Sequence, residues 1–218
     1  MVFTPQPASG NPSYPAFTSL LYNHGFRGGM AHLDQQRWFF RNAAEWHGIA
    51  ERLKQTPCPH CQVVGMLIRH GCLYGFDEHH HRHKTLRARR IFCSNRQARR
   101  GCGRTFSVWC ADKVRRLSLT TAGLWRFLLH AACGSIAAAI RAANCHLSDR
   151  SMQRIWNRFE LGQSKLRTAL FARCPPPQLP APPAQQTAAH VLAHLQAAFP
   201  NADCPIATFQ HTLRTFFI

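Results

Sequence analysis

The spacing of apolar residues changes along the chain and divides it into helical and β-like regions. From about Leu33 to Lys54, apolar side chains such as Trp38 and Trp46 recur at three- and four-residue steps, which predicts an amphipathic helix. Residues 57–110 instead alternate cysteines and basic loops with β-like runs at Gly65 to Arg69, Ala88 to Phe92 and Arg104 to Trp109. Residues 117–173 return to helical spacing. The pattern therefore predicts a small α+β protein.

Three helices are expected within residues 117–173. The first runs from about Thr120 to Ala132. Ser135 can cap a short second helix, and Asn144 suits the turn after it because Asn tolerates left-handed backbone angles. Ser148 can cap a third helix, whose buried side would consist of Met152, Ile155, Trp156 and Phe159. This order predicts a helix-turn-helix, although any small three-helix bundle would show the same spacing.

The opposite side of the third helix carries polar side chains. Arginine, asparagine and glutamine can bond the edges of bases in the major groove, and arginine can also bond phosphates. The residues expected to contact DNA from this helix are Arg150, Gln153, Arg154, Asn157 and Arg158.

Proline-rich segments set the expected domain boundaries. We expect a flexible tail at 1–18, an N-terminal helical segment at 19–56, a cysteine-bearing region with a basic loop at 57–116, a helical region at 117–173, a proline-rich linker at 174–185 and a C-terminal helical segment at 186–218. Phenylalanines gather in the last segment, at Phe199, Phe209, Phe216 and Phe217. They suggest that residues 186–218 dock a partner, either a transposase or a second copy of the chain.

The cysteines indicate a metal site. Cys58 and Cys61 are separated by two residues, a spacing that lets two thiolates grip one tetrahedral ion. We expect Cys93 and Cys102 to complete a Zn²⁺ site that supplies much of the stability of a small sheet, and Gly103 to let the backbone turn. Eight residues separate Cys93 from Cys102, so four other residues remain alternative ligands, namely Cys72, Cys110, His60 and His70. A set of unrelated reduced cysteines is the other interpretation.

The charge of the chain favours a polyanionic partner, nucleic acid first and an anionic membrane second. Lysine and arginine total 27 against 9 acidic residues, which gives a net charge of +18. A GC-rich genome could enrich arginine throughout the chain, but twelve of these cations fall between Arg82 and Arg116, beside the single acid Asp112. We expect phosphate contacts from the arginines of the cysteine-bearing region, namely Arg87, Arg89, Arg90, Arg96, Arg99, Arg100 and Arg104.

Several short motifs carry a resemblance to a known family. They are Cys58-Pro59-x-Cys61, Arg69-His70-Gly71, Arg90-x-x-Cys93 and Cys102-Gly103-Arg104-Thr105-Phe106-Ser107. They resemble the zinc ribbon that precedes a helix-turn-helix at the N-terminus of many bacterial insertion-sequence transposases, and in related small regulators. The resemblance implies a three-stranded antiparallel zinc ribbon, double-stranded DNA as partner, and a role in transposition, recombination or transcription regulation. It also implies a cytoplasmic, nucleoid-associated bacterial protein.

No catalytic residues are expected. Transposases of this kind continue into a domain with three spaced carboxylates, whereas the only acid after Glu160 is Asp203. We therefore expect neither an enzyme nor a small-molecule substrate. Two alternatives remain open: an RNA-binding zinc protein that stacks bases on Phe106 and Trp109, and a protein–protein adaptor.

Two further expectations concern membrane segments and a second metal site. The N-terminus does not resemble a secretory signal, and the longest apolar stretch, Leu124 to Ile140, contains Arg126, so no membrane span is expected. The histidine run from His79 to His83 is interpreted as a solvated loop tip rather than a second metal site.

Overall fold

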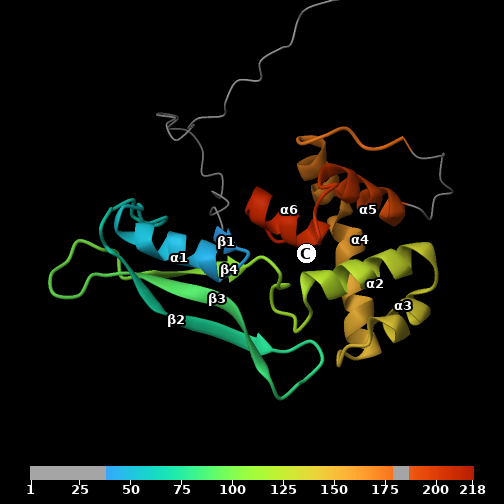
Figure 1. Ribbon diagram of the computed structural model, residues 1–218, viewed down its shortest axis with the longest axis horizontal. Helices are drawn as coiled ribbons and strands as arrows, with labels where there is room; N and C mark the ends of the chain where they lie inside the picture. Colours follow the sequence, from blue (N-terminus) through green and yellow to red (C-terminus); the bar gives the residue numbers. More distant parts are fainter. Residues whose placement is uncertain (1–37, 179–186) are drawn as a thin grey trace, which may run out of the picture. The chain divides into compact units, whose positions relative to one another are not determined.

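The computed structural model describes residues 38–178 and 187–218, and the expected tail at 1–18 lies outside them (Figure 1). Every element described here belongs to one compact unit within Gln35–Ile218. In chain order the elements are β1 (Trp38–Phe40), α1 (Ala43–Glu51), η1 (Arg52–Lys54), β2 (Leu67–Phe76), β3 (Lys84–Cys93), β4 (Thr105–Cys110), α2 (Thr121–Cys133), α3 (Ile136–Ala143), α4 (Asp149–Phe171), α5 (Thr187–Ala198) and α6 (Pro205–Leu213). The α+β class is confirmed.

The sheet has four strands in the order β1-β4-β3-β2. The three expected β-like runs are confirmed as β2, β3 and β4, which pair antiparallel, and β2 and β3 extend to ten residues each. The expectation of a purely antiparallel three-stranded sheet is wrong, because β1 pairs parallel with β4 from Trp38 opposite Val108 to Phe40 opposite Cys110.

Trp38 and Phe39 lie in β1 and not in a helix as their spacing predicts. Their rings pack edge-to-face on residues distant in sequence, with centroid distances of 5.3 Å from Trp38 to Phe106 and 5.2 Å from Phe39 to Phe216. The helix begins only at Ala43, where the side chain of Asn42 accepts a hydrogen bond from Glu45 N. Tertiary packing therefore overrides the helical pattern before Asn42.

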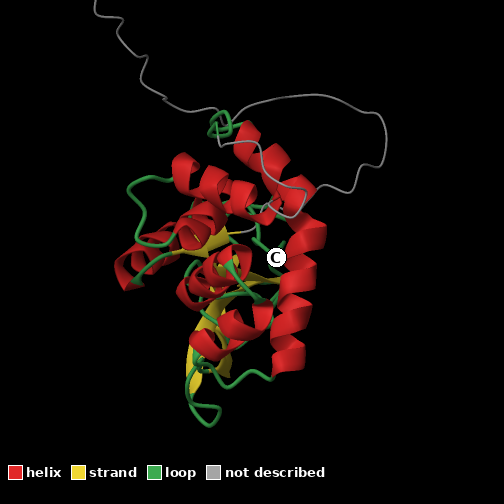
Figure 2. Cartoon of the chain, turned by 90° about the vertical axis from the view of Figure 1, so that its right-hand side faces the viewer, coloured by secondary structure: helices red, strands yellow, loops and turns green. Residues whose placement is uncertain are grey.

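The three helices expected within residues 117–173 are confirmed. Ser135 Oγ accepts from Ala138 N at 3.1 Å, and Asn144 adopts left-handed angles with φ 43° and ψ 50°. Ser148 caps α4 through Ser151 N. All four residues expected inside α4 are buried, and the helix continues to Phe171 with Leu166 and Leu170 also buried, which makes it the longest helix of the described residues (Figure 2).

The C-terminal helices belong to the same core as α2 and α4. Phe199, Phe209 and Phe217 are buried in one apolar cluster with residues of both helices, and Phe159 and Phe217 stack at 6.0 Å. Phe216 is half-buried beside Phe39 and Trp109. The phenylalanines that suggested a docking surface are thus used largely in internal packing. No helix among residues 38–178 and 187–218 has both the length and the apolar character needed to cross a membrane.

A buried carboxylate attaches the β2–β3 hairpin to the helices. Glu78 is 3% exposed, and its Oε2 accepts from Thr120 N at 2.7 Å, at the N-terminus of α2, where a negative charge is favoured. The backbone carbonyl of Glu78 accepts from His146 Nδ1 at 2.8 Å, in the turn before α4. Gly123 makes room for the Glu78 carboxylate beside Thr120, because a Cβ at Gly123 would lie 2.2 Å from Glu78 Oε1. The histidine run from His79 to His83 is exposed, as expected of a loop tip. His79 also contacts the helical region, since its Nδ1 donates to Asn144 O at 3.1 Å.

Replacement of Glu78 by alanine should lower the free energy of unfolding by about 2 kcal/mol, because the Thr120 amide loses its buried partner. Gly123→Ala should have a similar effect by displacing the carboxylate. The double variant should be destabilised by less than the sum, since both changes break one contact. Urea unfolding measures all three variants.

Gly162→Ala is the matched control, since nothing lies within 4 Å of a Cβ at Gly162 in α4. It should stabilise the protein by about 0.5–1 kcal/mol through helix propensity. Additive effects of Glu78→Ala and Gly123→Ala would contradict a shared contact.

Candidate metal centre

Four cysteine sulfurs converge at one end of the sheet. The Sγ atoms of Cys58, Cys61, Cys93 and Cys102 all lie within 4.8 Å of one another. Cys58 Sγ lies 3.8 Å from Cys102 Sγ, and Cys61 Sγ lies 3.7 Å from Cys93 Sγ. A tetrahedron of thiolates with metal–sulfur bonds of about 2.3 Å has edges of about 3.8 Å. The predicted set of four cysteines is therefore brought together, and it could hold one metal ion.

The first pair of cysteines is positioned by a tight turn after η1. Gln62 N donates to Cys58 O at 2.8 Å, and Cys58 N donates to Val63 O at 3.1 Å. The turn is completed by Gln62 in the left-handed region, with φ 61°. His60 N lies 3.4 Å from Cys58 Sγ, and such amide–sulfur contacts orient a ligand and stabilise its thiolate form.

Main-chain hydrogen bonds bring Cys93 and Cys102 together, although eight residues separate them in the sequence. Cys93 N donates to Arg104 O at 2.9 Å, and Gly103 N donates to Cys93 O at 3.0 Å. Gly103 has φ 70°, which agrees with the turn expected of this glycine. Cys102 N lies 3.4 Å from Cys93 Sγ. The residues between the two cysteines loop out, and Cys102 returns beside Cys93.

Gly101 is required by the closure of this loop. A Cβ at Gly101 would lie 2.1 Å from the carbonyl oxygen of Ser94, a main-chain atom that cannot move aside without moving Cys93. Ser94 is itself buried, and its N–H donates to Met66 O at 2.8 Å. The loop therefore leaves and rejoins the sheet at two fixed points.

The cysteine sulfurs differ in acidity. The backbone N–H of Val63 lowers the pKa of Cys61 to about 7, whereas burial raises the pKa of Cys93 to about 12. Burial also raises the pKa of Cys58. Two of the four thiols therefore resist ionisation, and a bound cation would supply the charge that stabilises them as thiolates.

The alternative ligands have other surroundings. Cys72 accepts a hydrogen bond from Arg89 Nη1 at 2.9 Å, and Cys110 is buried in β4, where burial raises its pKa to about 12. His70 packs against Phe92 at 5.3 Å. His60 lies next to the sulfurs in sequence, with its ring 6.3 Å from that of Phe106. None of these residues joins the cysteine cluster within the part of the chain described.

The seven arginines expected to contact phosphate from the cysteine-bearing region differ in their exposure. Arg87 is buried, and its guanidinium donates to the carbonyl oxygens of Leu119 and Phe76, so its expected role as a phosphate contact is corrected to an internal one. Arg89 is half-buried, 5.6 Å from the ring centre of Trp46. The other five arginines expected to bind phosphate from this region are exposed, namely Arg90, Arg96, Arg99, Arg100 and Arg104.

The polar side of α4 is exposed as its sequence predicts. All five expected DNA-contacting residues, Arg150, Gln153, Arg154, Asn157 and Arg158, lie at the surface. Gln153 Nε2 donates to Asn157 Oδ1 at 3.0 Å, so these two amides form a pair on successive turns. Glu78 and His146, by contrast, have no motif that marks them, and only their distant partners reveal their role.

Cys93→Ser should abolish stoichiometric metal binding, because hydroxyl is a poor replacement for thiolate in a tetrahedral sulfur site. Cys72→Ser is the matched control and should retain one metal ion per chain. Native mass spectrometry after purification in zinc-containing buffer measures both. A full complement of metal in Cys93→Ser would remove this residue from the ligand set.

Gly101→Ala should weaken metal binding without removing a ligand. The expected loss of affinity is roughly 10–100-fold, as for other changes that disturb ligand orientation. Competition with a chromogenic chelator measures it, and Gly48→Ala on α1, where the nearest atom to an added Cβ is 4.0 Å away, serves as control. Equal affinities of the two variants would show that the loop closure does not position Cys102.

Comparison with protein-family models, with curated proteins and with solved structures gives no match for this chain. The functional argument therefore depends on the residues and the geometry described above.

Proposed function

We propose that this chain is a zinc-dependent protein that binds double-stranded DNA, as a regulator or an accessory DNA-recognition subunit of a mobile element. The observation that carries the proposal is a loop of exposed arginines held at both ends by cysteines of a cluster that could bind a metal ion. The proposal includes no catalytic step.

Zinc is the metal that best suits the cluster. Four sulfur donors are typical of structural zinc sites, in which the protein fills every coordination position, and two of the sulfur–sulfur distances here, 3.8 Å and 3.7 Å, match the edge of such a tetrahedron. A site of this kind stabilises the fold and leaves no position for a substrate. Its contribution to DNA binding is to hold the backbone from which the arginines project.

The arginine loop occupies residues 94–101. Arg96, Arg99 and Arg100 are exposed there, and the loop contains no acidic residue. Arg99 N donates to Arg96 O at 3.2 Å, so the loop has an internal turn between its fixed ends. Guanidinium groups on a backbone restrained in this way bind phosphates with less loss of conformational entropy than groups on a free loop.

The first turns of α4 provide the second surface. Ser148 fixes where the helix begins, and Arg150, Gln153 and Arg154 project from its exposed side. An exposed helix that follows a short helix and a turn can enter the major groove, where these side chain types read bases. We therefore assign backbone contacts to the arginine loop and base contacts to α4.

The two alternatives make different use of the same residues. An RNA-binding protein needs exposed aromatic rings, and Phe106 packs against Trp38, which weakens that alternative for Phe106. A protein–protein adaptor gives no reason for the exposed arginines to gather between two metal ligands. Selection of bound duplexes from a random pool, with and without a chelator, tests DNA binding, sequence preference and metal dependence together.

Arg99→Ala should weaken binding to all duplexes similarly and flatten the dependence of log K on log salt by about 0.9, the slope of one phosphate contact. Arg154→Ala should instead reduce the preference for the selected sequence by about 1–3 kcal/mol. Arg167→Ala, at another exposed position further along α4, is the matched control and should change neither quantity. Salt titrations on selected and scrambled duplexes measure all three variants.

Equal effects of Arg99→Ala and Arg154→Ala on both duplexes would contradict the division between backbone and base contacts. Binding that persists unchanged in the presence of the chelator would remove the metal from the proposal.

A further inference from the structure

One face of the sheet is covered by α1 and η1, and the other is partly open. Leu53 of η1 and Ile91 of β3 belong to the same buried cluster, which places Ile91 on the covered face (Figure 1). Side chains alternate between the two faces along a strand, so Arg90 and Phe92 project from the opposite face. Arg90 is exposed and Phe92 is half-buried. The open face therefore carries a cation beside an aromatic ring, next to Cys93 of the sulfur cluster.

The cross-strand neighbours of Arg90 are small. Gly71 of β2 and Ser107 of β4 lie opposite Arg90 in the sheet, and neither side chain is long enough to cover a guanidinium. Residues 57–76 and 84–111, which include the three long strands, contain no aspartate or glutamate. Among the described residues, no hydrogen bond or ion pair uses the side chain of Arg90. Its guanidinium is therefore available to an external anion.

A second cation reaches the same face from the arginine loop. The guanidinium carbon of Arg96 lies 5.4 Å from the ring centre of Phe92, which is a cation–π contact. The exposed ring of His70, at an irregularity of β2, lies 5.3 Å from the same ring centre. Within the described part of the chain, no hydrogen bond or ion pair occupies the N–H groups of the Arg96 guanidinium. Phe92 therefore restrains this guanidinium and leaves its donors free.

The two cations occupy neighbouring positions on the open face. Arg90 and Phe92 are about 6.6 Å apart along β3, and Arg96 lies over Phe92, a spacing close to that of consecutive phosphates in one nucleic-acid strand. Thr105 lies opposite Phe92 and Ser107 lies opposite Arg90, so two hydroxyls of β4 flank the cations. Hydroxyl side chains also donate to phosphate oxygens. This set of groups matches a sugar-phosphate backbone.

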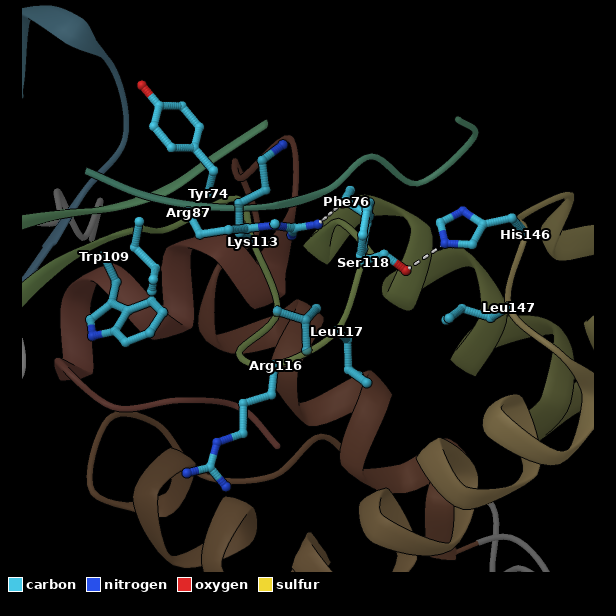
Figure 3. Close-up of a pocket in the computed structure, with 13 residues that line it drawn as sticks. Tyr74, Phe76, Arg87, Trp109, Lys113, Arg116, Leu117, Ser118, His146 and Leu147 are labelled. Atoms are coloured by element: carbon cyan, nitrogen blue, oxygen red, sulfur yellow. Dashed lines mark hydrogen bonds between the residues drawn. The ribbon is translucent and has the colours of Figure 1, made fainter. Parts of the chain in front are cut away.

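The far end of the same face offers no comparable site. A pocket of about 470 Å³ opens there, with Trp109 of β4 in its lining (Figure 3). Two of its cations are engaged, because Arg87 donates to two main-chain carbonyl oxygens and Lys113 lies 2.9 Å from Asp112. Figure 3 shows the guanidinium of Arg116 directed away from the pocket. Free cations therefore meet on this face only beside the sulfur cluster, among the residues described.

We propose that the open face of the sheet beside the sulfur cluster is part of the DNA interface. The backbone of a duplex crosses β3 and β4 there, with consecutive phosphates on Arg90 and Arg96, and Phe92 positions Arg96. A duplex suits this face better than a single strand, because Phe92 is half-buried and already in contact with Arg96 and His70, which leaves little of its ring for base stacking. The inference rests on the proposed function and adds to it a surface of the sheet and a positioning residue.

A double-mutant cycle tests whether Phe92 positions Arg96. Fluorescence anisotropy with the metal-loaded full chain and a labelled duplex measures the affinity. Phe92→Leu keeps an apolar side chain and removes the ring, so it should weaken binding about 2- to 5-fold, the value of an exposed cation–π contact. In the Arg96→Ala background the same change should have no further effect. In the Arg99→Ala background, by contrast, the two losses should multiply.

Ser107→Asp tests the path of the duplex across the sheet. The added carboxylate would neutralise Arg90 and repel a phosphate on this face, and should weaken binding roughly 10- to 100-fold. Ser164→Asp is the matched control, at an exposed position about 15 Å along α4 from Arg154. That separation exceeds the Debye length of about 8 Å at about 0.15 M salt, so the control should change the affinity less than about 2-fold. Circular dichroism and metal content check that each variant is folded.

The outcomes separate this inference from the proposed function. If Ser107→Asp weakens binding no more than Ser164→Asp, or if the losses from Phe92→Leu and Arg96→Ala multiply, the open face does not hold the backbone as proposed, although DNA binding by the chain stands. Tighter binding of a single-stranded DNA or RNA of the same length than of the duplex also overturns the inference. If the wild type binds no nucleic acid, the proposed function fails and this inference fails with it.

Discussion

The convergence of four cysteine sulfurs is the constraint on which the sheet depends. Its apolar cluster has eight buried residues, and two of them, Cys58 and Cys93, belong to the sulfur cluster itself. A core this small contributes too little burial to fix two turns and a long loop. Metal coordination would supply the missing free energy, because the ligands are far apart in sequence and meet only in the folded state.

The helices are stabilised differently, and polar contacts join them to the sheet. Their cluster buries large side chains from α2, α4, α5 and α6, so apolar burial suffices there. Three buried polar side chains cross the junction: Glu78, Arg87 and Gln210, the last of which donates to Ala111 O at 2.9 Å. Each bonds main-chain atoms of another element. Such contacts are specific in direction, and each one fixes a register that apolar packing alone leaves free.

Local signals in the sequence predict local structure well. The caps at Ser135 and Ser148, the turn at Asn144 and the spacing of Cys58 and Cys61 depend on neighbours within a few residues, and all are found as expected. The helix predicted at Trp38 is wrong because Trp38 pairs with Val108 in β4, 70 residues away in the sequence. Arg87 was expected to contact phosphate because of its charge, since a sequence shows the charge of a residue but not the carbonyl groups that compensate for its burial.

The loop between Cys93 and Cys102 shows why eight intervening residues do not keep the two sulfurs of this pair from joining the cluster. The two main-chain hydrogen bonds that close it, Cys93 N to Arg104 O and Gly103 N to Cys93 O, join residues at its base and do not involve its tip. Lengthening a closed loop is inexpensive, at about 0.6 kcal/mol for each doubling. The residues at its tip can therefore take any composition compatible with solvent, whereas Gly101 at its base has to remain glycine. Here that composition is rich in arginine, so the loop presents cations to solvent while the hydrogen bonds at its base hold the two cysteines.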